Sequence, residues 1–437
     1  MNSKDVFHHI VNTFCSMDIK FVILHSYQQL PEKIDSDIDI AIKIDRIDTA
    51  IHLLDSLLQG TGWRIIQFWR HEYYAADCVI SNDDEFLQVD FCIHYERNGR
   101  ILIPIDELIT GRKKYNNFYI PSSIIEFSYI LIKKILKKGF SERSKLQLNS
   151  LWLEMTLHEK ELVKRSMQRF LSVESMESIL KAIDQKNYNK LSMELLRNEL
   201  LHKSWNLKSN VHYVFFDLLR KIERIIHPTG MFLVLMGVDG AGKTTIANEL
   251  IPKYQPAFRR VRHYHSRVRV LNDLSRIGKG NTPIDVSKPH GKTFKAGKLL
   301  SFLKFGYYFM DYMIGNLIIT KAKIQSSLVL VERYYYDYYI DKLRYNINLP
   351  TGFLKFFSRF MKKPDLIFIL TGDSQILFDR KHEIKIEEID EQKKKLEELF
   401  HDNDRALFID TTVNSMSDCV NQMLAACNET MRGRRRW

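Results

Sequence analysis

A glycine-rich segment from Gly237 to Thr245 carries the clearest chemical signal in the sequence. Its letters GVDGAGKT match the pattern G-x-x-x-x-G-K-[ST] in full. Glycines let backbone N–H groups turn inward around phosphate oxygens, where a Cβ would clash. Lys243 has the reach to contact β- and γ-phosphate oxygens, and the Thr244 hydroxyl can ligate Mg²⁺. The segment therefore predicts a nucleotide-binding loop made of Gly237, Val238, Asp239, Gly240, Ala241, Gly242, Lys243, Thr244 and Thr245.

The residues around this loop predict the strand and the helix that a phosphate-binding loop needs. The apolar run 231–236 is typical of a strand, and TTIANELI after the loop is typical of a helix, whose N-terminus favours anions. Two further apolar runs, 327–331 and 365–370, resemble parallel strands that are buried on both faces. Ligands bind beyond the carboxyl ends of such strands, and Glu332 ends the first run. We expect an α/β domain with a parallel sheet, in which Thr244 and Glu332 hold a metal ion.

Residues 231–437 resemble the thymidylate kinase group of P-loop kinases. The matching pieces are the loop GVDGAGKTT, the strand-end acid-Arg-Tyr at 332–334, and PDLIFIL followed about ten residues later by RKHE at 380–383. The stretch 301–345 is also similar to divergent members found in bacterial surface-polysaccharide gene neighbourhoods. The resemblance implies ATP and Mg²⁺ as cofactors and four catalytic residues. These are Lys243, Glu332, Arg333 near the acceptor phosphate, and Arg380 (or Lys381) as the lid arginine that stabilises the transferring phosphoryl group.

For Arg333, Arg380 and Asp239, a purely structural role is an alternative to the functional one. Arg333 would form an ion pair with a nearby carboxylate, and Arg380 would belong to the solvated face of a charged helix. Asp239 would either contact the acceptor or stabilise the loop through an Asx-type hydrogen bond.

The sequence departs from the thymidylate kinase pattern at two places. The strand-end acid is Glu332 instead of Asp, and HYHSRVR (263–269) stands where those kinases carry an Arg-Glu-Pro-Gly segment that holds the nucleoside monophosphate. The sequence thus supports phosphoryl transfer but not thymidylate as the acceptor. Arg267 and Arg269 are either replacement acceptor contacts or surface arginines. His263 and His265 have no acidic neighbour in the sequence, so we predict no metal site there.

A second constellation lies near the N-terminus, where Asp37 and Asp39 are placed on one strand and Asp90 on another. Alternation puts Asp37 and Asp39 on one face, and a third carboxylate on a neighbouring strand would complete an oxygen cage for Mg²⁺. Residues 20–95 resemble the nucleotidyltransferase superfamily, with a turn, then Asp-x-Asp, then a lone Asp. The turn reads His25-Ser26-Tyr27 where that superfamily has Gly-Ser. An active transferase and a catalytically idle, binding-only fold both remain open.

Hydrophobic periodicity divides the chain into three predicted domains. Residues 1–112 mix short strands with a helix at 51–58 and form the nucleotidyltransferase-like α/β domain. Residues 113–228 carry long helix-period stretches and form a helical connector, in which Lys133, Lys134, Lys137 and Lys138 line a solvated or anion-binding face. The breaker HPTG (227–230) precedes the thymidylate kinase-like P-loop domain, residues 229–437.

Composition excludes several classes of protein. Hydrophobic residues make up 45% and charged residues 27% of the 437 residues, which is typical of globular domains and not of a disordered chain. Five scattered cysteines and the polar N-terminus favour a cytoplasmic protein over a secreted one. The stretch 299–319 is interrupted by Lys304 and Asp311, so it predicts a buried helix and no membrane span.

The net charge of +12 favours anionic partners, which fits a nucleotide and a small-molecule acceptor. No motif indicates nucleic acid, and nothing in the sequence sets the oligomeric state. The basic tail 432–437 is either a frayed terminus or a weak contact for a membrane surface.

The function that this sequence predicts is ATP- and Mg²⁺-dependent phosphoryl transfer to a sugar or nucleotide-like acceptor. The alternatives are nucleotidyl transfer at Asp37, Asp39 and Asp90, or a nucleotide-sensing scaffold without turnover.

Overall fold

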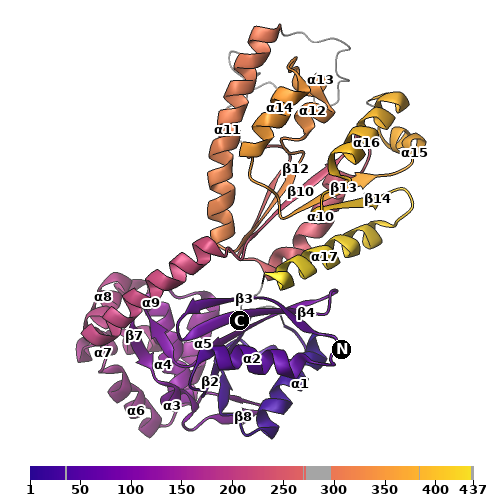
Figure 1. Cartoon of the computed structure of the whole chain (residues 1–437). Coiled ribbons are helices and arrows are strands. Elements are labelled where there is room, and N and C mark those ends of the chain that lie inside the picture. The colour runs from indigo at the N-terminus through magenta and orange to yellow at the C-terminus, as the bar shows by residue number, and fades with distance from the viewer. Residues whose placement is uncertain (35–36, 269, 272–296, 383, 435–437) are drawn as a thin grey trace. The chain divides into compact units, whose positions relative to one another are not determined.

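The computed structural model describes residues 1–437 except 35–36, 269, 272–296, 383 and 435–437 (Figure 1). The chain separates into two compact units, Met1–Ile222 and Glu223–Arg436. We call them unit 1 and unit 2, and each is described by itself. The boundary lies inside a helix, α9 (Leu207–Ile226), a few residues before the predicted breaker.

Unit 1 is built on a mixed five-stranded sheet in the order β1-β2-β5-β4-β3. Its strands are β1 (Phe21–Ile23), β2 (Ile38–Ile42), β3 (Arg64–Glu72), β4 (Ala75–Ser81) and β5 (Phe86–Cys92). Strands β2 and β5 pair in parallel, and the other neighbours pair antiparallel. The predicted strands at 21–24, 38–42 and 86–93 are therefore confirmed, as is the predicted helix, which lies within α2 (Ile47–Leu58).

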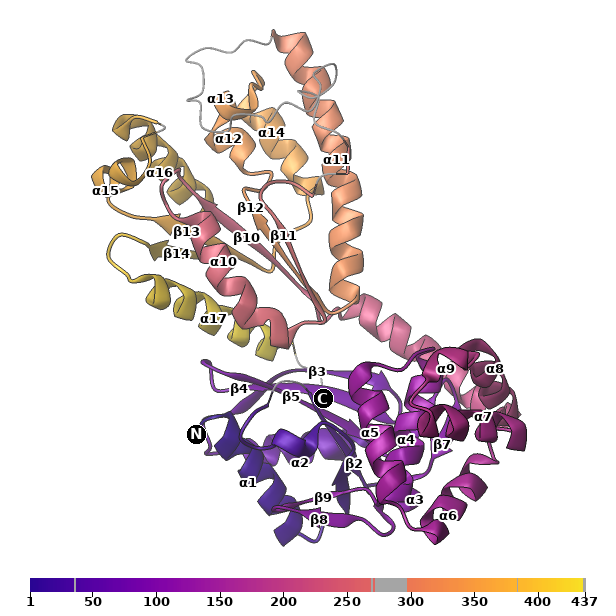
Figure 2. The ribbon, with the colours of Figure 1, turned by 180° about the vertical axis from the view of Figure 1, so that it is seen from behind.

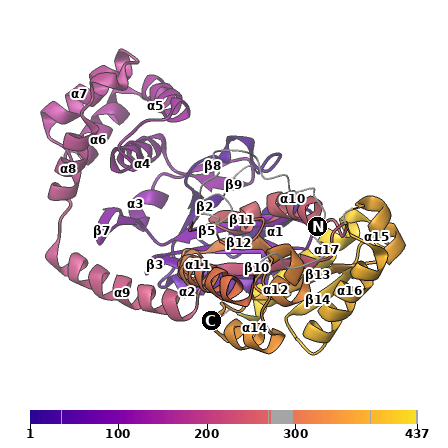
Figure 3. The same ribbon diagram turned by 90° about the horizontal axis from the view of Figure 1, so that it is seen from above.

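Both faces of this sheet are covered, because its strands alternate side chains between two hydrophobic cores. Phe21 and Ile23 join one core with α2 and α1 (Ser3–Ser16), whereas Val22 joins the other core with the helices that follow. Those helices are α4 (Ser123–Leu136), α5 (Glu142–Glu154), α6 (Leu157–Met167), α7 (Val173–Asp184) and α8 (Met193–Lys203). They form one helical group (Figure 3).

The predicted helical connector shares its core with the first predicted domain. The hairpin of β8 (Lys113–Tyr115) and β9 (Phe118–Ile120) comes after residue 112, yet Phe118 and Ile120 lie in the core that contains α1 and α2. A second hairpin, β6 (Tyr95–Arg97) with β7 (Arg100–Ile103), and the short α3 (Ile105–Ile109) complete unit 1. The division into three domains remains a prediction, in which the first two domains occupy one unit.

Unit 2 is a parallel α/β fold, as the sequence predicts. Its sheet has the order β11-β12-β10-β13-β14, and each neighbouring pair is parallel. The strands are β10 (Met231–Gly237), β11 (Arg260–Tyr264), β12 (Ser327–Glu332), β13 (Leu366–Thr371) and β14 (Ala406–Asp410). Central β10 is buried between β12 and β13 because its residues are apolar on both faces.

Helices flank the sheet of unit 2. Helix α10 (Lys243–Tyr254) packs beside α17 (Met416–Gly433), and α11 (Lys298–Ile324) lies along β12 and β10 (Figure 2). The remaining helices are α12 (Asp337–Ile340), α13 (Lys342–Tyr345), α14 (Thr351–Phe357), α15 (Ser374–Arg380) and α16 (Ile386–Phe400).

The predicted buried helix at 299–319 is only partly buried in the structure. Helix α11 is buried on one face only: Phe305 and Tyr312 lie in the core, whereas Leu299, Leu303 and Leu317 are exposed. Across the described residues, no helix is long and apolar enough to cross a membrane.

The basic tail is partly fixed onto unit 2 instead of frayed. Arg434 forms an ion pair with Asp365, with Nη2 and Oδ1 2.7 Å apart, and donates a hydrogen bond to the Gly230 carbonyl. Residues 435–437 lie outside the described residues.

Candidate functional site

The glycine-rich loop joins β10 to α10 and opens into a cavity of about 920 Å³. Two of its glycines have backbone conformations that other residues rarely adopt. Gly240 has φ +86°, and a Cβ there would stand 2.3 Å from the Leu377 carbonyl oxygen of α15. Gly242 has φ +79° directly before α10, whose N-terminal N–H groups have no partner within the helix. This arrangement has the geometry that the sequence predicts for an anion-binding site.

The cavity gathers most of the residues singled out in the C-terminal half. Its lining contains Asp239, Gly240, Ala241, Gly242, Lys243, Thr244, Thr245, Ile246, His265, Ser266, Glu332, Arg333, Arg344, Tyr345, Arg380, Lys381, Thr411, Asn414, Met416 and Cys419. All four predicted catalytic residues, Lys243, Glu332, Arg333 and Arg380, are therefore brought together at the carboxyl edge of the parallel sheet.

Lys243 is buried and turned onto its own loop. Its ammonium group donates hydrogen bonds to the carbonyls of Gly237 and Val238, at 2.9 and 2.8 Å. Burial first, and then the nearby Arg333, lower the pKa of Lys243 to about 7, although Asp239 opposes the shift. The loop carbonyls offer the Lys243 ammonium group only partial negative charge, whereas a phosphate bound in the cavity would offer it a full negative charge.

Asp239 is clamped between two arginines. Its two carboxylate oxygens contact the guanidinium groups of Arg333 and Arg344 separately, and Lys243 Nζ lies 4.0 Å away. Burial would raise the pKa of Asp239, but Arg333, Lys243 and Arg344 outweigh burial and hold it well below its usual range. The Asp239 side chain therefore serves as an ion-pair partner here, and the ion-pair interpretation of Arg333 holds in this structure.

Arg333 also adopts an uncommon backbone conformation. Its φ is +61°, in the left-handed region, directly after the last residue of β12. Its N–H donates to the Leu235 carbonyl of β10, and its guanidinium lies 3.6 Å from Asp337. This backbone turn directs Arg333 into the cavity beside the loop.

Sequence reasoning did not find Arg344. It precedes the last residue of α13 and pairs with Asp341 at 3.1 Å in addition to Asp239. Nothing in the local pattern YIDKLRYN distinguishes it from a surface arginine, because only the fold brings α13 to the loop.

Arg380 lines the cavity and remains exposed to solvent. It ends α15 and donates hydrogen bonds to the hydroxyl and the carbonyl of Thr411, at 3.1 and 2.8 Å. Thr411 follows β14 and lines the same cavity. Arg380 is thus held at the cavity wall, with Lys381 next to it.

Thr244 and Glu332 meet as predicted for metal ligands. The Thr244 hydroxyl donates to Glu332 Oε2 at 2.7 Å, so a hydroxyl and a carboxylate oxygen are already adjacent. Oxygen donors of this kind suit Mg²⁺, which binds to few protein ligands and keeps several waters.

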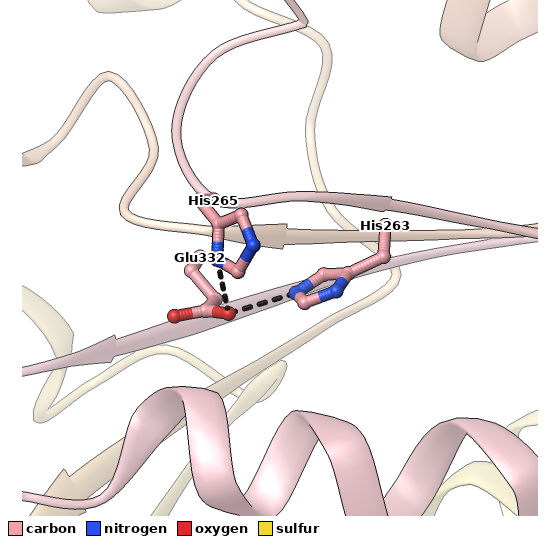
Figure 4. A group of neighbouring side chains, drawn as sticks. All are labelled: His263, His265 and Glu332. Atoms are coloured by element: carbon pink, nitrogen blue, oxygen red, sulfur yellow. Dashed lines mark hydrogen bonds and ion pairs between the residues drawn. The ribbon is translucent and has the colours of Figure 1, made fainter. Parts of the chain in front are cut away.

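The other Glu332 oxygen corrects a sequence expectation. Oε1 contacts His263 Nε2 at 2.7 Å and His265 Nδ1 at 3.1 Å (Figure 4). The expectation of no acidic partner for these histidines is wrong, because sheet pairing brings β11 and β12 together although they are about 65 residues apart in sequence.

Arg267 is neither a surface arginine nor part of the cavity lining. It is 6% exposed, its Nε pairs with Asp311 at 2.5 Å, and its guanidinium lies 4.4 Å from the Tyr308 ring centroid. The burial of this pair explains why α11 carries an aspartate on its core face. Arg269 lies outside the described residues.

The N-terminal carboxylates also converge. Asp39 of β2 and Asp90 of β5 are paired in parallel register, and each of Asp37, Asp39 and Asp90 has a carboxylate oxygen within 4.8 Å of the others. They line a cavity of about 330 Å³. Burial, then Asp77 and Asp39, raise the pKa of Asp90 to about 10.

Cationic side chains from α4 and the predicted turn lie at the same cavity. Lys133 Nζ is 2.6 Å from His25 Nε2, which also contacts Asp39, and Lys137 belongs to the lining. Two of the four lysines predicted for a solvated or anion-binding face therefore meet the carboxylates. Ser26 of the turn has φ +59°, a conformation that glycine adopts without strain.

Comparison with known proteins gives one class for part of the chain: over about 45% of its length it is similar to thymidylate kinases. A probable thymidylate kinase of Methanocaldococcus jannaschii is 26% identical over 202 residues, which cover 44% of this chain and 94% of that protein.

Two solved structures and a family search complete the comparison. The thymidylate kinase of Ehrlichia chaffeensis is 17% identical, with a TM-score of 0.30, and covers 45% of this chain and 98% of that one. The thymidylate kinase of Candida albicans is 17% identical, with a TM-score of 0.31. The matched region covers 47% of this chain and 94% of the Candida chain. No protein-family model matches the chain. The resemblance of the N-terminal region to nucleotidyltransferases remains a prediction.

Proposed function

We propose that this protein is an ATP- and Mg²⁺-dependent kinase that transfers a phosphoryl group to a small acceptor. The observation that carries this proposal is the cavity in which the glycine-rich loop, the Thr244–Glu332 pair, Arg333 and Arg380 meet. In the transfer, the acceptor oxygen forms a bond to the γ-phosphorus while the bond to the bridging β,γ-oxygen breaks, and ADP leaves.

Each residue of the cavity has a role in this transfer that follows from its position. The loop amides and Lys243 bind the β- and γ-phosphates, which keeps them oriented for in-line attack. Arg333 and Arg380 offset the negative charge that spreads over the transferring group. Thr244 and Glu332 would hold Mg²⁺, which would neutralise part of the negative charge of the phosphates.

Lys243→Ala tests this function. We expect loss of phosphoryl transfer by about 100-fold or more, because the variant lacks a charge in contact with the reacting phosphates. The fold should persist, as measured by circular dichroism. Products of ATP with nucleosides, nucleoside monophosphates and sugars would be identified by mass spectrometry.

Lys253→Ala on the same helix is the matched control, since Lys253 is exposed and donates a hydrogen bond to Asn421 Oδ1 at 3.4 Å. Turnover equal to wild type in Lys243→Ala would contradict the kinase proposal. ATP consumption without a phosphorylated product would favour the nucleotide-sensing scaffold.

Thymidylate should be a poor acceptor. The segment that holds the nucleoside monophosphate in thymidylate kinases is replaced by residues 263–269, and Arg267 is committed to Asp311. Steady-state kinetics should give a kcat/KM for thymidylate at least about 100-fold below that for the best acceptor of the screen, a loss of about 2.7 kcal/mol. Efficient phosphorylation of thymidylate at micromolar concentration would contradict this expectation.

We propose nucleotidyl transfer as a second candidate function, located at Asp37, Asp39 and Asp90. The supporting observation is that the three carboxylates converge in one cavity beside Lys133 and Lys137. Three carboxylates of this kind would hold Mg²⁺. Pyrophosphate release from nucleoside triphosphates should disappear in Asp90→Asn and persist in Asp106→Asn, whose carboxylate is exposed and paired with Lys43. If the unaltered chain releases no pyrophosphate, the result would favour a catalytically idle, binding-only fold.

A further inference from the structure

Three side chains from two neighbouring strands present ligand atoms to one point beside the phosphate-binding loop. His263 Nε2, His265 Nδ1 and a Glu332 oxygen all lie within 4.8 Å of one another (Figure 4). Both imidazoles approach the same oxygen, Oε1, at 2.7 and 3.1 Å. The two rings are 4.6 Å apart between centroids.

Sheet register produces this convergence. Strands β11 and β12 run parallel, and the last register pair is Tyr264 with Val331. One residue later come His265, directly after β11 ends, and Glu332, the last residue of β12, while His263 lies within β11. The three side chains therefore gather where both strands end, at the carboxyl edge that borders the cavity.

The donor set distinguishes this cluster from a magnesium site. Two imidazole nitrogens and one carboxylate oxygen suit Zn²⁺, Co²⁺ and related first-row ions, whereas Mg²⁺ favours oxygen ligands. Around tetrahedral Zn²⁺, ligand atoms stand about 3.3 Å apart. The present separations of 2.7 and 3.1 Å need only a small opening, and the His265 side chain is 69% exposed and free to adjust.

We propose that His263, His265 and Glu332 form a binding site for a divalent transition-metal ion, with an open coordination position toward the phosphate-binding cavity. His265 and Glu332 line that cavity, so the open position would accept an oxygen of an anionic ligand bound there. Glu332 is 4% exposed, and burial fixes its carboxylate between the two histidines and Thr244.

This site is distinct from the Thr244 position expected for Mg²⁺, although the two share one carboxylate. Oε1 faces the imidazoles, and Oε2 accepts the Thr244 hydroxyl hydrogen bond at 2.7 Å. The proposal goes beyond phosphoryl transfer, because metal binding by the histidines requires neither ATP nor an acceptor.

The experiment is a titration of the metal-stripped full chain with Co²⁺, Zn²⁺ and Mg²⁺ in the absence of nucleotide. Calorimetry measures the affinity for each ion, and the absorption spectrum of bound Co²⁺ reports which ligand atoms coordinate it. We expect Co²⁺ and Zn²⁺ to bind more tightly than Mg²⁺, with nitrogen coordination visible in the Co²⁺ spectrum. His265→Ala and His263→Gln should each weaken the Co²⁺ affinity at least about tenfold. Mg²⁺ binding at the Asp37, Asp39 and Asp90 cavity should be the same in all proteins.

His401→Ala is the matched control, because His401 is exposed and stands 3.9 Å from its carboxylate neighbour, Asp402. Co²⁺ binding by His265→Ala that equals wild type would overturn the proposal, as would an unaltered chain that binds no Co²⁺. If His263→Gln does not fold, the Co²⁺ affinity of His265→Ala alone tests the proposal, because His265 is exposed and its replacement should not disturb the fold. Intact Co²⁺ binding without any phosphoryl transfer would contradict the kinase proposal only.

Discussion

At the scale of single residues, the chemistry of the cavity depends on charges that are buried close together. Lys243, Arg333 and Arg344 lie around one carboxylate, Asp239, and the two arginines also contact Asp337 and Asp341. Burial, and then Arg333, lower the pKa of Lys243 to about 7, so its charge is sensitive to pH near neutrality.

Nucleotide binding should therefore weaken as the pH rises through neutrality. The pKa of Lys243 is lowered to about 7 in the free protein, first by burial and then by Arg333, so the amine loses its proton above that pH. Phosphate binding favours the protonated form, so binding above pH 7 must include proton uptake. The affinity for ADP without metal should fall roughly tenfold between pH 7 and pH 8.5, as measured by calorimetry.

Lys243→Arg provides the reference for this pH profile, because a guanidinium keeps its charge throughout the range. Its ADP affinity should change little between the same two pH values. Parallel profiles for the two proteins would show that Lys243 is not the titrating group.

At the scale of elements, the loop is fixed by its packing against β13 and α15 as much as by its own sequence. A Cβ on Gly237 would meet the Leu370 carbonyl oxygen of β13 at 2.5 Å, and one on Gly240 would meet the Leu377 carbonyl oxygen of α15 at 2.3 Å. These contacts join the loop to the element that ends with Arg380. A change in the loop should therefore also disturb the opposite cavity wall.

Gly240→Ala should damage nucleotide binding although it adds only a methyl group. The left-handed backbone at φ +86° disfavours alanine by about 1 to 2 kcal/mol, and the contact with Leu377 adds to this cost. We expect ADP affinity to fall at least about tenfold in calorimetry, because a new loop path misplaces the phosphate-binding amides.

Gly352→Ala is a suitable control in the same unit. Gly352 lies in α14, and nothing stands within 4 Å of an added Cβ, so its ADP affinity should equal wild type. ADP affinity in Gly240→Ala equal to that of this control would contradict the packing argument.

At the scale of the whole molecule, each candidate site takes its ligands from a single unit. Asp37, Asp39 and Asp90 all belong to unit 1, whereas the loop, Glu332 and the arginines belong to unit 2. Neither set of ligands needs a residue of the other unit to complete it.

The two sites should therefore be chemically separable. The double variant Asp37→Asn, Asp39→Asn lacks two charges but keeps the size of both side chains, so unit 1 should lose divalent-ion affinity. ADP release that depends on Lys243 should stay within a few-fold of wild type in the intact chain, since the residues proposed to bind ATP all belong to unit 2. Loss of turnover by orders of magnitude in the double variant would instead show that the two sites are coupled.

The sequence by itself determined the strand, loop and helix around Gly237–Thr245, and the strands at 21–24, 38–42, 86–93, 327–331 and 365–370. These features are contiguous, so glycine spacing and apolar runs define their backbone conformation before any long-range contact forms. The strand-end positions of Glu332 and Arg333 follow from the same local pattern. The meeting of Thr244 with Glu332 was predictable because it rests on a known relation between adjacent parallel strands.

Only the tertiary structure decided which distant side chains share a cavity. His263 and His265 acquire Glu332 through the pairing of β11 with β12, Arg344 reaches Asp239 from α13, and Arg267 is buried against Asp311. The helices after residue 120 also share a hydrophobic core with strands of the N-terminal sheet. Such contacts depend on strand order, register and helix placement, which arise from packing over the whole chain and leave no mark in local residue spacing.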